Sequence, residues 1–170
     1  MNASNQNFSS ENGILFNKDK SILIRYPAGI SGPYTIPSTV STISKIAFQY
    51  CSGLSSISLP SSVSSIESGA FDYCTNLTNI NIPTNVYSIG GTFRNCTKLI
   101  SITVDEANAQ YCSTDGVLFN KSKTELIKYP CAKSGGYNIP STVNIIKNAA
   151  FGACAELSEV SLPESVQYIQ

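Results

Sequence analysis

The sequence predicts a solenoid of stacked coils, β-dominated with short helical or 3₁₀ turns, and interrupted by two β-hairpin insertions. Two observations predict this fold class. An aliphatic–proline step recurs at intervals of 22 or 23 residues, with one longer interval of 35 residues. In addition, a segment near the start of the chain is repeated at an offset of 103 residues. Self-similarity at such periods is typical of architectures in which each unit packs only against its neighbours.

The shorter period defines the coils. Each unit reads aliphatic-P-x-x-V-x-x-I, then A-F-x-x-C, then x-x-L-x-x-I. The steps that mark it are Ile36-Pro37, Leu59-Pro60, Ile82-Pro83, Ile139-Pro140 and Leu162-Pro163, and Val104-Asp105 holds the same phase.

These steps predict a single domain over residues 1–170. It contains regular coils at 36–58, 59–81, 82–103 and 139–161, hairpin-bearing coils at 1–35 and 104–138, and a partial coil at 162–170.

Each regular coil is expected to contain two strands. The segment 54–59 (LSSISL) predicts a strand that the following proline ends, and shorter strands are expected at 40–43, 63–66 and 143–146. The intervening stretch 45–51 favours one short helical or 3₁₀ turn. A unit this small cannot bury its apolar face alone, so neighbouring coils must cover it. We therefore expect one side-chain file along the stack, formed by Phe48, Phe71, Phe93 and Phe151.

The longer period marks a duplicated hairpin. Residues 8–37 align without gaps on residues 111–140, with 16 identities in 30 positions. Both copies place short apolar runs on either side of a polar turn, at 17–21 in the first copy and 120–124 in the second. Two short strands around a polar turn predict a β-hairpin. Each hairpin lengthens its coil by about twelve residues.

Composition excludes several function classes. Eleven basic and eleven acidic residues cancel, and only 13% of residues are charged, so the chain lacks the electrostatics of a dedicated nucleic-acid binder. Histidine is absent, which excludes Ser/His/Asp or Cys/His catalysis and His-ligated zinc. No stretch approaches the roughly 18 apolar residues of a spanning helix, and Met1 to Glu11 carry no secretory signal pattern. Asp105-Glu106 offers no catalytic couple. We expect no enzyme activity, no cofactor, no metal and no membrane insertion.

The six cysteines fall into two groups. Four occupy the A-F-x-x-C slot or its one-residue-shorter version and are expected to stack as a column of small apolar thiols: Cys51, Cys74, Cys96 and Cys154. The sequence contains no C-x-x-C pair of the kind that would indicate a metal site. Cys112 and Cys131 lie outside this column and flank the second hairpin, where they are either bridged by a disulfide or left as two unpaired thiols.

Most of the basic side chains belong to the hairpin segments. They could meet acidic glycans or nucleic acid, but we favour the interpretation that they shield exposed hairpin edges from aggregation. The seven residues are Lys18, Lys20, Arg25, Lys121, Lys123, Lys128 and Lys133.

The quoted repeats resemble the leucine-rich repeat class, and more closely the BspA-like leucine-rich repeats of bacterial and protist surface proteins. The matching text is the I-P-S-T-V-x-x-I run from Ile36, the A-F-x-x-C-x-x-L run from Ala47 and the hairpin from Gly116. The resemblance covers nearly the whole chain. It implies a curved solenoid with strands on its concave side, and a role in adhesion or in binding host or matrix proteins.

These observations lead to two functional hypotheses. The first is a non-enzymatic binding module at the cell surface or secreted, where its placement rests on the resemblance, with a protein or glycan ligand. The alternative is a cytoplasmic structural or scaffold protein. In either case the outward strand positions form the candidate binding face: Ser56, Ser58, Asn79, Asn81, Ser101, Thr103, Glu159 and Ser161.

The end of the sequence adds one expectation. The chain stops part-way through the coil that begins at Leu162, and no polar cap is evident. Val166 and Ile169 should then present apolar surface, which predicts end-to-end self-association.

Overall fold

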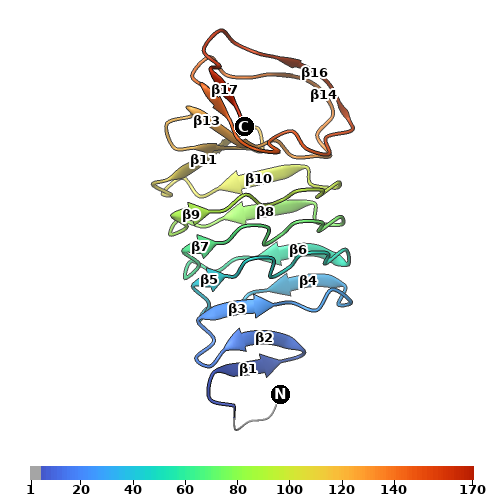
Figure 1. The fold of residues 1–170 in the computed structure, drawn as a ribbon, viewed down its shortest axis with the longest axis vertical. Helices are drawn as coiled ribbons and strands as arrows, with labels where there is room; N and C mark the ends of the chain where they lie inside the picture. The colour runs from blue at the N-terminus through green and yellow to red at the C-terminus, as the bar shows by residue number, and fades with distance from the viewer. Residues whose placement is uncertain (1–4) are drawn as a thin grey trace.

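The computed structural model describes residues 5–170 as a stack of about six β-coils. Met1–Ser4, the start of the predicted coil 1–35, lie outside the described residues. The stack rises from the N-terminus to the C-terminus along one axis (Figure 1). It contains 17 short strands, and residues 5–170 include no helix. The predicted β-dominated solenoid is therefore confirmed.

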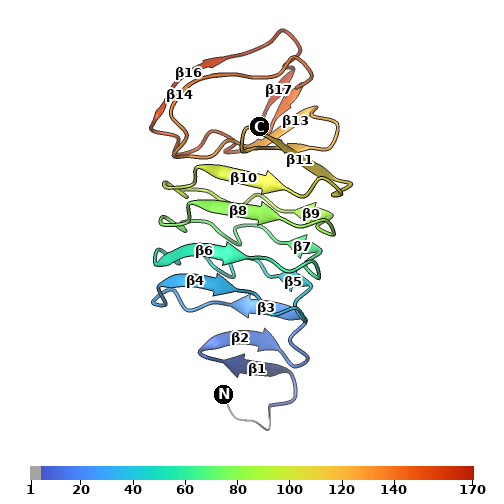
Figure 2. The same cartoon turned by 180° about the vertical axis from the view of Figure 1, so that it is seen from behind.

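One face of the stack carries the longer strands, and we call it the long-strand face (Figure 2). These strands pair in parallel as β4 with β6, β8 with β10, and β14 with β16. Side chains alternate between core and solvent, most clearly in β8, as the two-residue period of a strand requires. The strands are β4 (Gly32–Thr35), β6 (Leu54–Ser58), β8 (Asn79–Ile82), β10 (Ser101–Val104), β14 (Gly135–Asn138) and β16 (Leu157–Ser161).

The opposite face carries strands of two residues. The backbone N–H of Glu67 donates to the Ile43 carbonyl oxygen at 2.9 Å, so hydrogen bonds between coils continue beyond each short strand. The apolar member of each early strand, such as Ile43 or Ile66, is buried. The strands are β5 (Thr42–Ile43), β7 (Ser65–Ile66), β9 (Ser88–Ile89), β15 (Ile145–Ile146) and β17 (Tyr168–Ile169).

Both predicted hairpins are present, and each gains a third strand that the sequence did not predict. The turn of each hairpin is closed by an asparagine: the Asn17 side-chain oxygen accepts from the Ile22 N–H at 2.8 Å, and the Asn120 oxygen accepts from the Glu125 N–H at 2.9 Å. The antiparallel strands are β1 (Phe8–Glu11), β2 (Ile14–Asn17) and β3 (Ile22–Arg25), and, in the second copy, β11 (Tyr111–Thr114), β12 (Val117–Asn120) and β13 (Glu125–Lys128).

The predicted helical turn at 45–51 is wrong. Ile46 and Tyr50 adopt left-handed backbone conformations, with φ of 56° and 64°. Consecutive turns replace the helix, and the Phe48 N–H donates to the Ala70 carbonyl oxygen of the next coil at 2.8 Å. A right-handed helix would have used this donor internally. Hydrogen bonding between coils therefore wins over local helix formation.

Aromatic rings form two files. In the first, centroid separations are 5.0 Å from Tyr26 to Phe48, 5.2 Å from Phe48 to Phe71, and 5.5 Å from Phe71 to Phe93. The predicted file is thus confirmed for Phe48, Phe71 and Phe93. Phe151 does not continue it, because it packs against Tyr129 at 5.4 Å in a second file.

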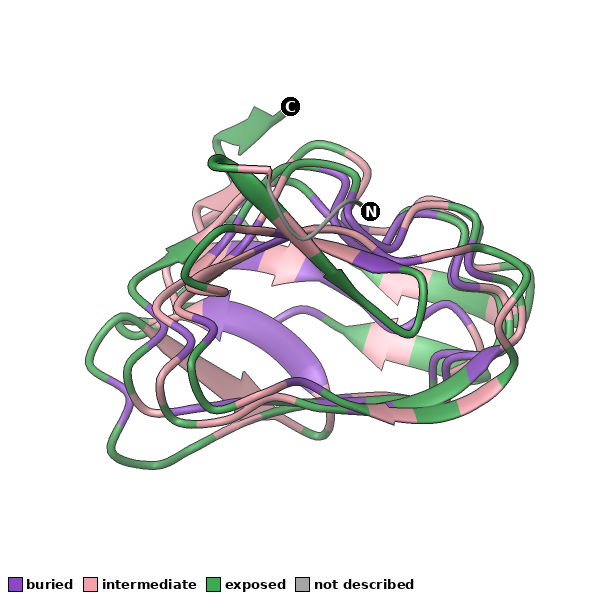
Figure 3. Cartoon of the chain, turned by 90° about the horizontal axis from the view of Figure 1, so that it is seen from below, coloured by how far each residue is buried: buried purple, intermediate pink, exposed green. Residues whose placement is uncertain are grey.

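The buried side chains likewise form two clusters, within coils that enclose one interior (Figure 3). The clusters meet at β12. Leu118 belongs to the cluster of the N-terminal coils, whereas Val117 and Phe119 belong to the C-terminal cluster. Successive side chains of a strand point to opposite sides, so one strand serves both cores. We call β12 the seam between two blocks.

The seam is set by a close backbone contact. The Ile102 N–H of β10 donates to the Gly116 carbonyl oxygen at 2.9 Å. Gly116 has a φ of 77°, and a Cβ there would lie 2.7 Å from the Ser101 Oγ. Only glycine combines this conformation with this approach. The hairpin therefore follows β10 directly, in the place where another long strand would otherwise continue the sheet.

Candidate functional site

Six of the eight predicted face residues lie together on the long-strand face, on β6, β8 and β10. All six are exposed except Ser101, which is half-buried. We call them the central ladder: Ser56, Ser58, Asn79, Asn81, Ser101 and Thr103.

Strand register aligns the part of the ladder on β8 and β10, whereas β6 pairs with β4 and contacts β8 without strand pairing. Asn79 lies opposite Ser101, and Asn81 lies opposite Thr103. The Thr103 hydroxyl donates to the Asn81 side-chain oxygen at 2.9 Å, so the side chains of neighbouring coils are within direct hydrogen-bonding reach. Such short, uncharged side chains lose little rotational freedom when they bind a ligand. The ladder can exchange neutral hydrogen bonds with a polar ligand.

The other two predicted residues are separated from this ladder. Glu159 and Ser161 lie on β16, which pairs only with β14 in a sheet of its own. The hairpin that follows β10 at the seam lies between β10 and this sheet. The eight predicted positions therefore form two groups.

Two strands of the long-strand face, β4 and β14, were not predicted from the sequence. Thr35 of β4 lies opposite Ser58, and Asn138 of β14 lies opposite Ser161. The signal was available, because Tyr34 and Tyr137 occupy the apolar position that Ile57 occupies in β6. The glycines and proline of these two segments obscured it.

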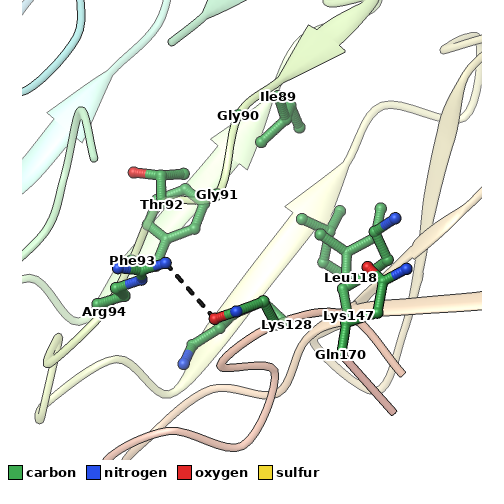
Figure 4. A pocket seen from close by; sticks show the side chains of 12 residues that line it. Ile89, Gly90, Gly91, Thr92, Phe93, Arg94, Leu118, Lys128, Lys147 and Gln170 are labelled. Carbon is green, nitrogen blue, oxygen red and sulfur yellow. Dashed lines mark hydrogen bonds between the residues drawn. The ribbon is translucent and has the colours of Figure 1, made fainter. Parts of the chain in front are cut away.

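A pocket of about 200 Å³ opens at the seam (Figure 4). Phe93, Leu118 and Ile127 contribute apolar surface, while Arg94 and Lys147 contribute positive charge. Within the pocket, the Arg94 guanidinium donates to the Asn148 side-chain oxygen at 3.5 Å. No pattern in the sequence predicts this pocket, because its walls come from coils that become neighbours only across β12.

The basic side chains of the hairpins mostly bond to the chain itself. Lys20 pairs with Glu11 at 2.7 Å, and Lys121 donates to the Asn108 carbonyl oxygen at 2.6 Å. Further donations to carbonyl oxygens come from Lys18, Arg25, Lys128 and Lys133. These contacts favour the structural interpretation of the basic residues over an acidic ligand.

Three of the cysteines form the predicted column. Cys51, Cys74 and Cys96 are fully buried. The Cys74 thiol donates to the Phe48 carbonyl oxygen at 3.2 Å, and the Cys96 thiol donates to that of Phe71 at 3.1 Å. Burial raises the pKa of Cys51 to about 11 and that of Cys96 to about 12. Protonated, enclosed thiols of this kind are unreactive.

Of the predictions for the other cysteines, the placement of Cys131 away from the column is wrong. Cys131 is buried within reach of the column: its Sγ lies 3.2 Å from the Gly152 carbonyl oxygen, and the Cys154 Sγ lies 3.7 Å from the same atom. Cys112 instead lies on β11, 3.2 Å from the Asn120 carbonyl oxygen. Of the two alternatives for Cys112 and Cys131, the structure has the unpaired thiols, and all six cysteines are free. The chain turns inward after Pro130, away from β11.

Within residues 5–170, no three His, Cys, Asp or Glu side chains are grouped so that they could hold a metal ion. The same residues include no helix of the length and apolarity needed to cross a membrane.

Comparison with solved structures identifies similar folds. A leucine-rich cell surface protein from Faecalibacterium prausnitzii is 38% identical, with a TM-score of 0.74, over 81% of this chain and 37% of that protein. The pneumococcal vaccine antigen PcpA is 20% identical, with a TM-score of 0.62, over 96% of this chain and 66% of that one. A leucine-rich repeat protein from Eubacterium ventriosum is 20% identical, with a TM-score of 0.57, over 97% and 60% of the two chains. The last two similarities show the fold alone.

The chain thus spans about a third of the length of the Faecalibacterium protein. A search of curated proteins found no match. A family model described as the BspA type leucine-rich repeat region, in six copies, matches residues 33–136 and 128–170. The chain therefore belongs to the BspA-type leucine-rich repeat family.

Proposed function

We propose that the chain is a non-enzymatic recognition module of a cell-surface protein, and that its central ladder binds an extended protein segment or a glycan. Leucine-rich repeat proteins of this family are generally protein-binding modules. The surface location is supported by the similarity to the Faecalibacterium prausnitzii protein, which is a leucine-rich cell surface protein.

The observation that carries the proposal is the alignment of exposed neutral side chains across neighbouring coils. Asn79 and Ser101 are in register, as are Asn81 and Thr103. Neighbouring strands in a sheet lie about 4.8 Å apart, so polar groups recur along the stack at that spacing. A ligand with polar groups repeated along its length can contact successive rungs. Because the ladder carries no charge, we expect its binding to depend little on salt.

Binding of the purified chain to a glycan array and to a panel of extracellular matrix proteins tests the proposal. In the test variants, Asn79→Arg or Ser56→Arg places a bulky cation on the ladder. The matched control is Ser141→Arg, because Ser141 is also exposed but lies in the turn between β14 and β15. We expect at least a tenfold loss of affinity for the ladder variants, or about 1.4 kcal/mol, and none for the control.

Equal binding by wild-type, ladder and control proteins would reject the ladder as the site. Thermal melting of each variant checks that the stack stays folded. Location is tested separately, by treating intact producing cells with protease. A surface module is cleaved without lysis, whereas protection until lysis supports the scaffold alternative.

We also propose that the last coil supports self-association. Leu162, Tyr168 and Ile169 are 56%, 62% and 68% exposed, which leaves apolar surface at this end of the described chain. Sedimentation velocity over a range of concentrations tests this. We expect an average mass that rises with concentration, and a strict monomer throughout would contradict the proposal.

A further inference from the structure

Three side-chain groups converge on one backbone oxygen in the second block. The Gly152 carbonyl oxygen lies 3.2 Å from the Lys128 Nζ, 3.2 Å from the Cys131 Sγ and 3.7 Å from the Cys154 Sγ. The Lys128 ammonium also donates to the Ala149 carbonyl oxygen at 3.1 Å. Two thiols and a cation thus share a small space between adjacent coils.

The duplicated first block contains no such cluster. Offset by 103 residues, Arg25 replaces Lys128, and it donates to the carbonyl oxygens of Ile46 and Gln49. Ala28 occupies the position of Cys131, so Cys51 has no second thiol at the place equivalent to the pair. The thiol pair is therefore an addition to the second block and is not required by the repeat.

The surroundings of the pair favour a thiolate. A hydrogen bond with the Cys154 thiol and the nearby Lys128 ammonium lower the pKa of Cys131 despite its burial. The same hydrogen bond, together with burial, raises the pKa of Cys154. The hydrogen bond thus favours the thiolate form of Cys131 and the thiol form of Cys154. By contrast, burial raises the pKa of each thiol in the column formed by Cys51, Cys74 and Cys96.

The cluster is also within reach of solutes. Cys131 is only 1% exposed, but Cys154 is half-buried. Lys128 borders the seam pocket of about 200 Å³ (Figure 4). The fully buried thiols of the column have neither feature.

We propose that Cys131 and Cys154 form a redox-active dithiol, which closes into a disulfide between adjacent coils when it meets a low-molecular-weight disulfide. The two coils are hydrogen-bonded to each other near the pair, because the Tyr129 N–H donates to the Ala150 carbonyl oxygen at 2.9 Å. Both thiols approach the Gly152 carbonyl oxygen, at 3.2 and 3.7 Å, and a hydrogen bond links the two side chains, so the two sulfur atoms lie close enough for a disulfide to close.

The chemistry is a two-step exchange. A thiolate of the pair attacks one sulfur of the external disulfide and releases one small thiol, leaving a mixed disulfide. The second cysteine, as a thiolate, attacks the protein sulfur of that mixed disulfide and releases the second small thiol. The two cysteines together lose two protons and two electrons, and the external disulfide gains them. The product ties the coil containing Cys154 to the end of the hairpin-bearing coil.

Oxidised glutathione is a suitable probe. The fully reduced chain is incubated with it, remaining thiols are alkylated, and peptides are mapped by mass spectrometry without reductant. We expect a Cys131–Cys154 cross-linked peptide, with Cys51, Cys74 and Cys96 recovered as alkylated thiols after denaturation. Cys131→Ala, which copies the first block, should abolish the cross-link, whereas Cys112→Ser should retain it.

Lys128→Met tests the cation separately. It should slow formation of the cross-link, because it removes the charge that favours the thiolate. The wild-type map is decisive even if a variant fails to fold. Recovery of Cys131 and Cys154 as free thiols from natively folded protein in excess oxidised glutathione would overturn the proposal. A stable glutathione adduct on either cysteine would also overturn it.

Discussion

The two copies of the hairpin segment, residues 8–37 and 111–140, have the same fold but different surroundings. The first copy lies at the start of the stack, with Gly13 and Phe8 exposed. The second copy lies between two blocks, where Leu118 is buried, whereas its counterpart Leu15 in the first copy is half-buried. The residues that the two copies share determine their three-stranded antiparallel fold. The neighbouring coils determine how deeply the side chains of that fold are buried.

The same contrast extends to chemistry. Arg25 and Lys128 both donate to carbonyl oxygens of the next coil, but Arg25 is half-buried and Lys128 is only 2% exposed. The same position thus carries a half-buried cation in the first copy and a buried cation beside two thiols in the second. Comparing equivalent substitutions in the two copies separates the effect of the motif from that of its surroundings.

The largest effect is expected from the two aromatic files. Phe71 is fully buried and lies between two other rings, so Phe71→Ala should lower the free energy of unfolding by about 3–5 kcal/mol. Phe151→Ala should cost less, because Phe151 is half-buried. Urea denaturation measures both. Equal losses of free energy in the two variants would show that the two files are packed equally tightly.

The glycines at the equivalent hairpin turns should differ next. Both have positive φ, 82° at Gly13 and 77° at Gly116, so alanine at either position costs about 1–2 kcal/mol in strain. A Cβ at Gly116 would also lie 2.7 Å from the Ser101 Oγ. A Cβ at Gly13 would lie 3.4 Å from its nearest neighbour, the Pro27 ring. Overpacking adds about 1–3 kcal/mol at Gly116 alone. Matching urea midpoints for the two variants would argue against a tight seam.

Removing the two equivalent cations should give a smaller difference. Lys128→Ala leaves the carbonyl oxygens of Ala149 and Gly152 without this donor and should cost about 1–3 kcal/mol. Arg25→Ala should cost less than about 1 kcal/mol, because water can replace the half-buried guanidinium. Chemical denaturation of reduced protein compares them. A larger loss of stability for Arg25→Ala than for Lys128→Ala would contradict the conclusion that Lys128 is the more buried of the two cations.

The smallest effect is expected at the head of the second file. The Tyr129 hydroxyl is buried without a hydrogen-bond partner. Tyr129→Phe removes an unsatisfied polar group, so the free energy of unfolding should stay unchanged or rise by about 1 kcal/mol. Thermal melting at several denaturant concentrations measures the change. A clear loss of stability would indicate that the hydroxyl has a partner.

Much of the fold could be predicted from the sequence, because local patterns determine it. The proline after Leu59 ends the β6 segment, and the polar turns at 17–21 and 120–124 fix both hairpins. The turns at 45–51 could not be predicted in this way. Left-handed conformations at Ile46 and Tyr50 are contrary to the preferences of β-branched and aromatic residues, and bonds to the next coil compensate for them.

The candidate sites also differ in whether a local pattern is enough to predict them. Alternation along one strand was enough to place Asn79 and Asn81 on the exposed face. The seam pocket and the pairing of Cys131 with Cys154 depend on which coils become neighbours across β12. Cys131 and its counterpart Ala28 lie in the same local pattern, which gives no sign that Cys131 is near another thiol. Sequence therefore indicates faces well and contacts between blocks poorly.

The central claim is that two cores meet at one strand. Native-state hydrogen exchange at increasing urea concentration tests it most directly. The Tyr129 and Lys147 amides, bonded to Ala150 and Leu126, should exchange through one opening reaction. The Ser44 and Glu67 amides, bonded to Leu23 and Ile43, should remain protected to higher urea through a second reaction. A single opening free energy and urea dependence for all four amides would contradict the account.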